Sequence, residues 1–157
     1  MTSPLHQINV TYVPTEDRLL MRVTTREGDE YRVWLTRRYC LLLLGVLQKQ
    51  MDQFGGAPSL ASSRETRQMF KQGAMDKTFD TEQGSRYPLG ETGIIACRLN
   101  AGTNEQGERS IQILPEQGQG VTLNLNKALL YLFYNVLTQG IGQADWRIAD
   151  DTAAQLH

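Results

Sequence analysis

The chain has 157 residues, which is the length of one domain or of two very small ones, and its 40% apolar and 21% charged residues exclude an intrinsically disordered or fibrous protein. Sixteen Lys and Arg stand against 17 Asp and Glu, and the resulting net charge of −1 excludes a globally basic nucleic-acid-binding protein while leaving room for a local basic patch. The two cysteines, Cys40 and Cys97, are too few for a disulfide scaffold or a four-cysteine zinc site and favour a reducing compartment. The N-terminus lacks signal-peptide character, and the longest apolar run is far shorter than the about 20 residues of a membrane span. We therefore expect a cytoplasmic protein without a membrane partner.

Three strands and a long helix are predicted in the first part of the chain, after a loose end at residues 1–6. Apolar and polar residues alternate from Ile8, from Leu19 and from Tyr31, which is typical of a three-stranded antiparallel meander. Thr36 is a candidate N-cap residue, because its hydroxyl can accept from an amide two or three residues further on. A helical period follows and predicts a deeply buried helix that ends near Gly55, with an apolar stripe of Cys40, Leu42, Leu43, Leu44, Val46, Leu47 and Met51.

The segment 56–92 is predicted to connect two halves of the chain. A polar helix is expected over about 59–72 and a loop over 73–92. Arg64, Arg67 and Lys71 lie at i, i+3 and i+7 of that helix and form a basic stripe. The stripe either meets an acidic partner or faces water.

The second half repeats the layout of the first. Strands are predicted over 94–99, 109–114 and 121–125, with a polar loop at 100–106 and a turn at 115–120. Ile111 and Ile113 should point inward, and Asn126 should cap a second buried helix whose end is marked by Gly140 and Gly142. Trp146 is expected to return to the body of the protein, and residues 150–157 to form a flexible tail.

The two halves match at a constant offset of 90 residues. Leu35-Thr36-Arg37 aligns with Leu125-Asn126-Lys127, and Met21 and Val23 align with Ile111 and Ile113. One strand–helix unit is too small to bury its own apolar face, whereas two units can cover each other. The pattern predicts a single α+β domain of internally duplicated β-β-β-α units, 7–55 and 93–142, in which antiparallel meanders pack on two buried helices. Shared binary patterning without common descent is the simpler alternative.

This layout resembles the duplicated sheet-and-helix units of the PUR-repeat and Whirly families, which bind single-stranded nucleic acid. Those families use four strands for each helix, whereas three are predicted here, and no diagnostic motif of either family is present. The resemblance covers the layout of most of the chain and implies a candidate ligand class. The sequence is also similar to small proteobacterial proteins, a resemblance that implies no particular activity.

No catalytic, cofactor-binding or metal-binding residues are predicted. The two histidines, His6 and His157, lie at opposite ends of the chain, and the two cysteines are interpreted as small core residues rather than nucleophiles. Phosphate-binding loops, dinucleotide fingerprints and metalloprotease motifs are absent from the sequence. The acidic residues near the C-terminus lack the spacing of a calcium loop and are interpreted as a solvated tail. We therefore expect a protein that is not an enzyme.

One strand face combines basic and aromatic residues. Strand alternation places Arg18, Arg22, Arg32 and Trp34 together, whereas the equivalent positions of the second half, Glu108, Gln112, Thr122 and Asn124, are not basic. Such a face either recognises a macromolecule or is an ordinary solvated surface. The first hypothesis is a binding or adaptor protein with an unknown protein partner or with itself as partner. The alternative is a single-stranded nucleic-acid-binding protein in which guanidinium groups meet phosphates and the indole stacks on a base.

Charge is distributed unequally along the chain. Residues 1–77 hold 11 Lys and Arg against 8 Asp and Glu, a net charge of +3. Residues 78–157 hold 5 against 9, a net charge of −4. Opposite charge on two related halves is compatible with steering toward a protein partner or toward a second copy of the chain.

Overall fold

A computed structural model describes residues 5–53 and 86–146 of the chain. The predicted weak helix over 59–72, its basic stripe Arg64, Arg67 and Lys71, and the tail 150–157 lie outside the described residues. The elements in chain order are β1 (Leu5–Val13), β2 (Arg18–Thr25), β3 (Glu30–Leu35), α1 (Arg37–Gln53), β4 (Ile94–Ile95), β5 (Arg98–Thr103), β6 (Arg109–Leu114), β7 (Val121–Leu125) and α3 (Lys127–Ala144).

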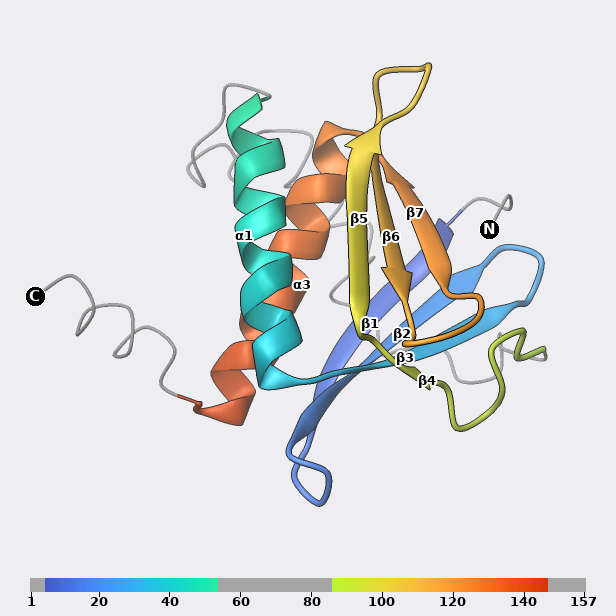
Figure 1. The fold of residues 1–157 in the computed structure, drawn as a ribbon, viewed down its shortest axis with the longest axis vertical. Helices are drawn as coiled ribbons and strands as arrows, with labels where there is room; N and C mark the ends of the chain where they lie inside the picture. The colour runs from blue at the N-terminus through green and yellow to red at the C-terminus, as the bar shows by residue number, and fades with distance from the viewer. Residues whose placement is uncertain (1–4, 54–85, 147–157) are drawn as a thin grey trace, which may run out of the picture.

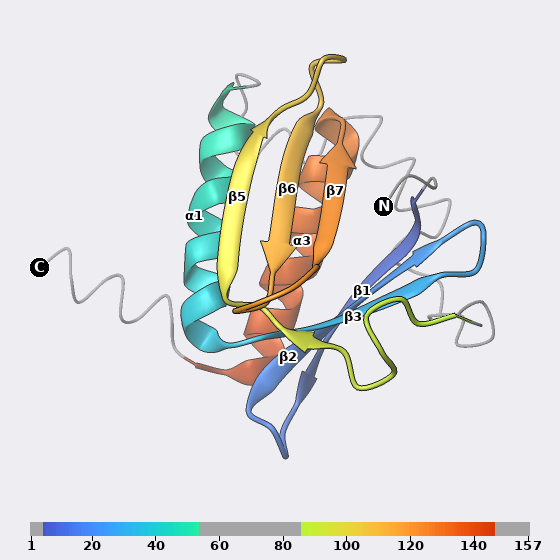
Figure 2. The ribbon, with the colours of Figure 1, turned by 45° about the vertical axis from the view of Figure 1, so that its right-hand side comes forward.

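The described strands form two separate sheets, and the predicted α+β class with antiparallel meanders is confirmed. The first sheet has the order β1-β2-β3-β4, in which only the short β4 runs parallel to its neighbour, and the second has the order β5-β6-β7. Helices α1 and α3 lie side by side, the second sheet covers one side of this pair, and the first sheet crosses α3 nearer its C-terminal end (Figures 1 and 2). Neither helix in the described part of the chain is long and apolar enough to cross a membrane.

Both predicted helix caps are confirmed. The Thr36 hydroxyl accepts a hydrogen bond from the Tyr39 amide at 3.2 Å, and the Asn126 side chain accepts from the Leu129 amide at 2.9 Å. Each bond satisfies one of the amides that a helix start leaves without an intrahelical partner. Both helices therefore begin where a short polar side chain follows an apolar strand.

The end of α3 lies beyond the predicted position, because Gly140 is inside the helix. A Cβ atom at Gly140 would lie 2.6 Å from Val10 Cγ1 and 3.3 Å from Leu19 Cδ1. Glycine is thus required for the close approach of α3 to the first sheet and does not signal termination. The helix ends instead at Asp145, which adopts a left-handed conformation (φ 51°) and whose amide donates to the Gly142 carbonyl.

The pairing within the two sheets follows the offset of 90 residues. Met21 pairs with Val33, and the positions 90 residues further on, Ile111 and Leu123, also pair. The inward residues of these strands are fully buried, as predicted for Ile111 and Ile113. The register is the one expected of two related units. Descent by duplication remains a prediction.

The region 94–103 corrects the predicted strand boundaries. The sequence predicts a single strand at 94–99 followed by a polar loop, but β4 belongs to the first sheet and β5 extends to Thr103 in the second. The Ala96 amide donates to the Trp34 carbonyl, while the next amide, of Cys97, donates to the Leu114 carbonyl. The chain therefore changes sheets between these two residues. Most β5 side chains are exposed at the sheet edge, so apolar alternation does not mark this strand.

The predicted deep burial of α1 is wrong on one side of the helix. Cys40, Leu43, Leu47 and Met51 are buried as expected. Leu42, which the periodicity assigns to a wider buried stripe, is 50% exposed. Its position lies on the opposite side of the helix from the packed stripe.

A hydrogen-bonded cluster attaches the end of α3 to the turn between β1 and β2. One carboxylate oxygen of Asp17 accepts from the Tyr12 hydroxyl at 2.7 Å and from Trp146 Nε1 at 2.9 Å. The rings of Tyr12 and Trp146 meet edge to face, with centroids 6.0 Å apart. Trp146 thus returns to the body of the protein, as predicted. The Tyr12 bond, and secondly the Trp146 bond, lower the pKa of Asp17 because both stabilise the charged form.

This cluster predicts an acid transition that can be observed at Trp146. The favourable contribution of the ionised Asp17 is present above the ordinary carboxyl pKa and is lost as the pH falls through the lowered folded pKa, hence below about pH 4. In a Trp34→Phe background, the emission of Trp146 should change in that range before the far-ultraviolet dichroism is lost. The Asp17→Asn variant should lack this step. A step that persists in Asp17→Asn would contradict the assignment.

Candidate functional site

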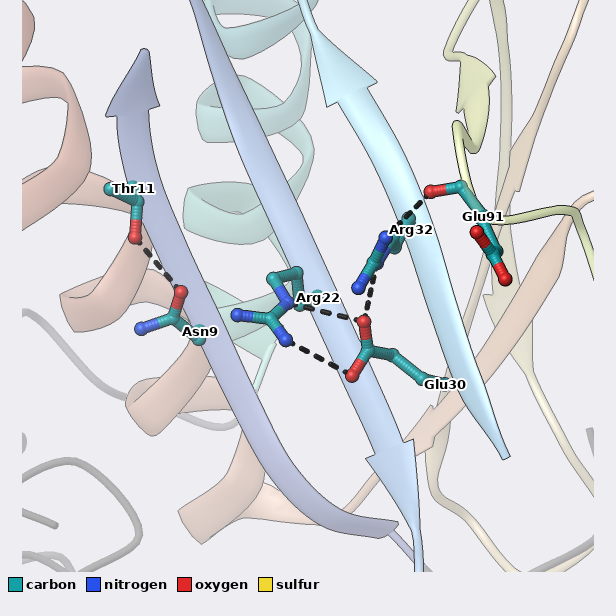
Figure 3. Close-up of polar contacts among 6 residues, drawn as sticks. All are labelled: Asn9, Thr11, Arg22, Glu30, Arg32 and Glu91. Carbon is teal, nitrogen blue, oxygen red and sulfur yellow. Dashed lines mark hydrogen bonds and ion pairs between the residues drawn. The ribbon is translucent and has the colours of Figure 1, made fainter. Parts of the chain in front are cut away.

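The register of β2 and β3 brings the four predicted site residues to the same side of the first sheet. Arg22 lies directly opposite Arg32, and Trp34 lies opposite Leu20, one alternation from Arg18. We call this side, which is turned away from the helices, the outer face; Figure 3 shows Arg22, Glu30 and Arg32 on it. The intervening residues of both strands point to the core. Strand alternation therefore predicts the placement of these side chains.

A buried carboxylate lies between two of the arginines. The Glu30 side chain is 0% exposed and accepts from Nε and Nη2 of Arg22, each at 3.2 Å, in a two-bond pair. Arg32 Nε also donates to Glu30 (Figure 3). Paired charges of this kind tolerate burial, whereas an isolated charge does not. The sequence-based prediction of this face omits Glu30, although its shared alternation with Arg32 places both side chains on one side of the sheet.

Two of the arginines lie over aromatic rings. The guanidinium carbon of Arg18 lies 5.0 Å from the centre of a Trp34 ring, and that of Arg32 lies 4.6 Å from the centre of the Tyr87 ring. Trp34 Nε1 donates to the Thr92 carbonyl at 2.8 Å, and Arg32 Nη1 donates to the Glu91 carbonyl at 2.7 Å. These bonds fix the rotamers of Trp34 and Arg32, so the face is preorganised. Tyr87 is a second residue that sequence reasoning missed, since no local pattern connects it to β3.

The backbone conformation of Gly93 permits the approach of residues 86–95 to β3. Its φ angle is +82°, which strains any residue with a side chain. A Cβ atom there would also lie 2.4 Å from the carbonyl oxygen of Arg32. The segment that holds Trp34 and Arg32 in place therefore depends on a glycine at this position.

The outer face is less basic than its arginines alone suggest. Arg18 forms an ion pair with Glu16, in addition to the pairing of Arg22 and Arg32 with Glu30. Three guanidinium groups are thus accompanied by two carboxylates within contact distance. The corresponding side of the second sheet is uncharged at its centre, where Asn100, Gln112 and Thr122 are connected by hydrogen bonds. The structure places no continuous basic surface across both sheets in the described part of the chain.

The two cysteines occupy different environments. Cys40 is buried, and burial raises the pKa of its thiol to about 12, which removes thiolate character at neutral pH. Cys97 is exposed and directly precedes β5. Among residues 5–53 and 86–146, no three potential metal-ligating side chains lie together. The histidine at position 6 is on β1, and the other is outside the described residues.

Thiol titration tests this difference in environment. At neutral pH in native buffer, an aromatic disulfide reagent should release one equivalent of its chromophore through Cys97, and the second equivalent only after denaturant is added. The Cys97→Ser variant should lose the fast equivalent and keep the slow one. Two fast equivalents in the native protein would show that Cys40 is accessible.

No family model, curated protein or solved structure matches this chain. The assignment of a function therefore depends on the geometry of the described residues.

Proposed function

We propose that this chain is a non-catalytic binding protein that recognises a protein partner through the outer face of its first sheet. The observation that carries the proposal is the environment of Trp34, whose indole is fixed by the Thr92 carbonyl and stacked by Arg18. Ile95 pairs with Trp34 across the strands and is 46% exposed. Tryptophan and arginine are enriched among the residues that dominate binding energy in protein interfaces.

Preorganisation supports a binding role for this face over that of a passive surface. The side chains of Trp34 and Arg32 already occupy fixed positions before any partner arrives. A partner would therefore order few additional rotamers, which lowers the entropic cost of association. The apolar surface of Ile95 beside the indole adds area that water solvates poorly.

The pattern of charges favours a protein partner over a nucleic-acid strand. Binding of a phosphate backbone requires cationic side chains that can replace the counterions of the phosphates. Here Arg22 and Arg32 already form ion pairs with Glu30, and Arg18 forms an ion pair with Glu16. A strand placed along this face would meet guanidinium groups whose charge is already balanced by the buried Glu30 and by the exposed Glu16. The stack of Arg18 on Trp34 is the observation that favours the nucleic-acid alternative, because it resembles the surroundings of a stacked base.

Site-specific crosslinking tests the proposal. A photoreactive amino acid is placed at Ile95, and for comparison at Asn124, which is exposed on the far side of the second sheet. A protein captured from position 95 and not from position 124 is then purified and titrated calorimetrically. Trp34→Ala should weaken that binding by about thirtyfold or more, whereas Asn124→Ala should leave it unchanged. Equal capture at both positions, or unchanged affinity of Trp34→Ala, would overturn the proposal.

Fluorescence anisotropy with labelled single-stranded DNA and RNA tests the alternative. The expected result is weak binding, or none, at low salt. Tight binding that falls steeply as salt rises, and that is lost in both Arg22→Ala and Trp34→Ala, would replace the protein partner with a nucleic-acid strand. Circular dichroism of both variants establishes that they are folded.

A further inference from the structure

One side of α1 is unusually apolar for an exposed surface. Leu41 is 42% exposed and Leu42 is 50% exposed, and Gly45 one turn later is also exposed. Within the described part of the chain, helix α1 lies at the edge, with α3 and the second sheet on its other sides (Figures 1 and 2). We call this side the outward face of α1; its exposed residues are Arg38, Leu41, Leu42, Gly45, Gln48, Lys49 and Asp52.

The two helices differ in exposure at positions that correspond by the offset of 90 residues. The positions 90 residues after Leu41 and Leu42 are Tyr131 and Leu132 on α3, which are 1% and 2% exposed. The two helices thus carry large apolar residues at matching places, but only α3 buries them within the described chain. The apolar character of the outward face is therefore not explained by packing among residues 5–53 and 86–146.

The charges of the outward face oppose the helix dipole. Arg38 lies in the first turn of α1 and Asp52 in the last, and α1 has no acidic residue in its first turn and no basic residue in its last. Basic groups near a helix start and acidic groups near a helix end are both unfavourable within an isolated helix. An arrangement that brings an opposite charge to each end would remove this penalty.

Gly45 lies midway between these two charges. Arg38 precedes it by seven residues and Asp52 follows it by seven, and seven residues are close to two helical turns, so all three share one line along the helix. We propose that the outward face of α1 binds a second copy of the chain, with the two α1 helices antiparallel about a twofold axis at Gly45. Each Arg38 then faces the partner's Asp52, and two ion pairs form in each dimer.

The contacts at the centre of this arrangement follow from the same symmetry. Gly45 has no side chain, and a Cβ built there meets no atom within 4 Å, so the two helix backbones can approach closely. Leu41 and Leu42 then pack beside the partner's Gly45 and against the aliphatic stem of the partner's Lys49. The antiparallel orientation also opposes the two helix dipoles. Self-association through α1 is independent of the proposed function, which concerns the first sheet.

Charge-reversal variants test the dimer by sedimentation velocity over a range of protein concentrations. The wild-type chain should change from monomer to dimer as its concentration rises. Arg38→Glu and Asp52→Arg should each weaken self-association by about tenfold or more, because each converts two attractive pairs into two repulsive ones. Both substitutions improve the charges relative to the helix dipole, so each monomer should melt no lower than the wild-type chain. A loss of dimer therefore cannot be attributed to misfolding.

A mixture of the two variants provides the decisive test of the antiparallel pairing. In an antiparallel pair, Glu at position 38 of one chain faces Arg at position 52 of the other, and the second pair is the native Arg38 with the partner's Asp52. An equimolar mixture should therefore form heterodimers although neither variant forms homodimers. Lys127→Glu is the matched control, since it makes the same charge change at an exposed position in the first turn of α3 and should leave association unchanged.

A variant without charge change examines the apolar centre. Leu42→Gln should weaken the dimer and leave monomer stability nearly unchanged, because this side chain is half exposed in the monomer. Any one of three results would overturn the proposal: a monomer at all concentrations, a dimer that resists both charge reversals, or a mixture that fails to associate. The first would leave the outward face to a different protein or to solvent.

Discussion

Replacing Glu30 by glutamine is expected to lower the free energy of unfolding by about 2–3 kcal/mol. The substitution keeps the shape of the side chain but removes its charge. Arg22 and Arg32 would then lie side by side with side chains only 17% and 26% exposed and without the carboxylate that both contact. Removal of one partner from a fully buried ion pair costs about 3–5 kcal/mol, and the partial exposure of the arginines reduces this cost. Urea denaturation followed by circular dichroism measures the change.

The surface ion pair of the same face provides the matched control. Glu16 contacts Arg18, but its side chain is 42% exposed. Glu16→Gln should therefore cost less than about 1 kcal/mol. A double-mutant cycle adds the specific test, because Arg32→Gln should cost less in the Glu30→Gln background than in the wild-type chain. Additive costs would show that Glu30 and Arg32 are not energetically coupled.

The second large effect is expected at Gly140, where alanine should destabilise the protein by about 1–3 kcal/mol. The added methyl group would lie 2.6 Å from Val10 Cγ1, and the β-branched Val10 side chain has little rotamer freedom to move aside. Ordinary helix propensity predicts the opposite sign, since alanine is favoured over glycine within a helix by up to about 1 kcal/mol. The measured sign thus distinguishes packing from propensity.

Gly142 lies two residues further along the same helix and serves as the control. It is exposed, and a Cβ built there meets no atom within 4 Å. Gly142→Ala should therefore be neutral or stabilising by up to about 1 kcal/mol. If both substitutions stabilise the protein, α3 does not approach β1 as closely as described. Truncation of Val10 to alanine should relieve the cost of Gly140→Ala.

Features specified by neighbouring residues could be predicted from the sequence. Thr36 and Asn126 act as caps because the capping bond spans only three residues, and Ile111 and Ile113 face inward because alternation has a period of two. The shared side of Arg22 and Arg32 follows from the same alternation. For these residues, the local pattern contains the structural information.

Features that depend on distant partners could not be predicted in this way. Gly140 has the sequence context of a helix end until Val10, 130 residues earlier in the chain, is known to lie against it. β5 lacks an apolar period because the edge position leaves its side chains exposed. The ion pairing of Glu30 with Arg22 joins two strands, and Glu30 directly follows residues typical of a hairpin turn, so local pattern assigns it no partner. In each case the feature depends on a contact or a sheet position that arises only in the folded protein, so the local sequence does not show it.

The packing of α3 on β1 has a consequence for biosynthesis. The last described helix, α3, covers β1, the first described strand, and Trp146 bonds to the turn that follows that strand. The apolar side of β1 and β2 therefore lacks this covering helix until α3 (Lys127–Ala144) has also left the ribosome. Contacts between such distant residues also slow folding, because a large loop must close before they form. Nascent chains of this protein should consequently depend on chaperones for longer than chains of equal length whose helices cover adjacent strands.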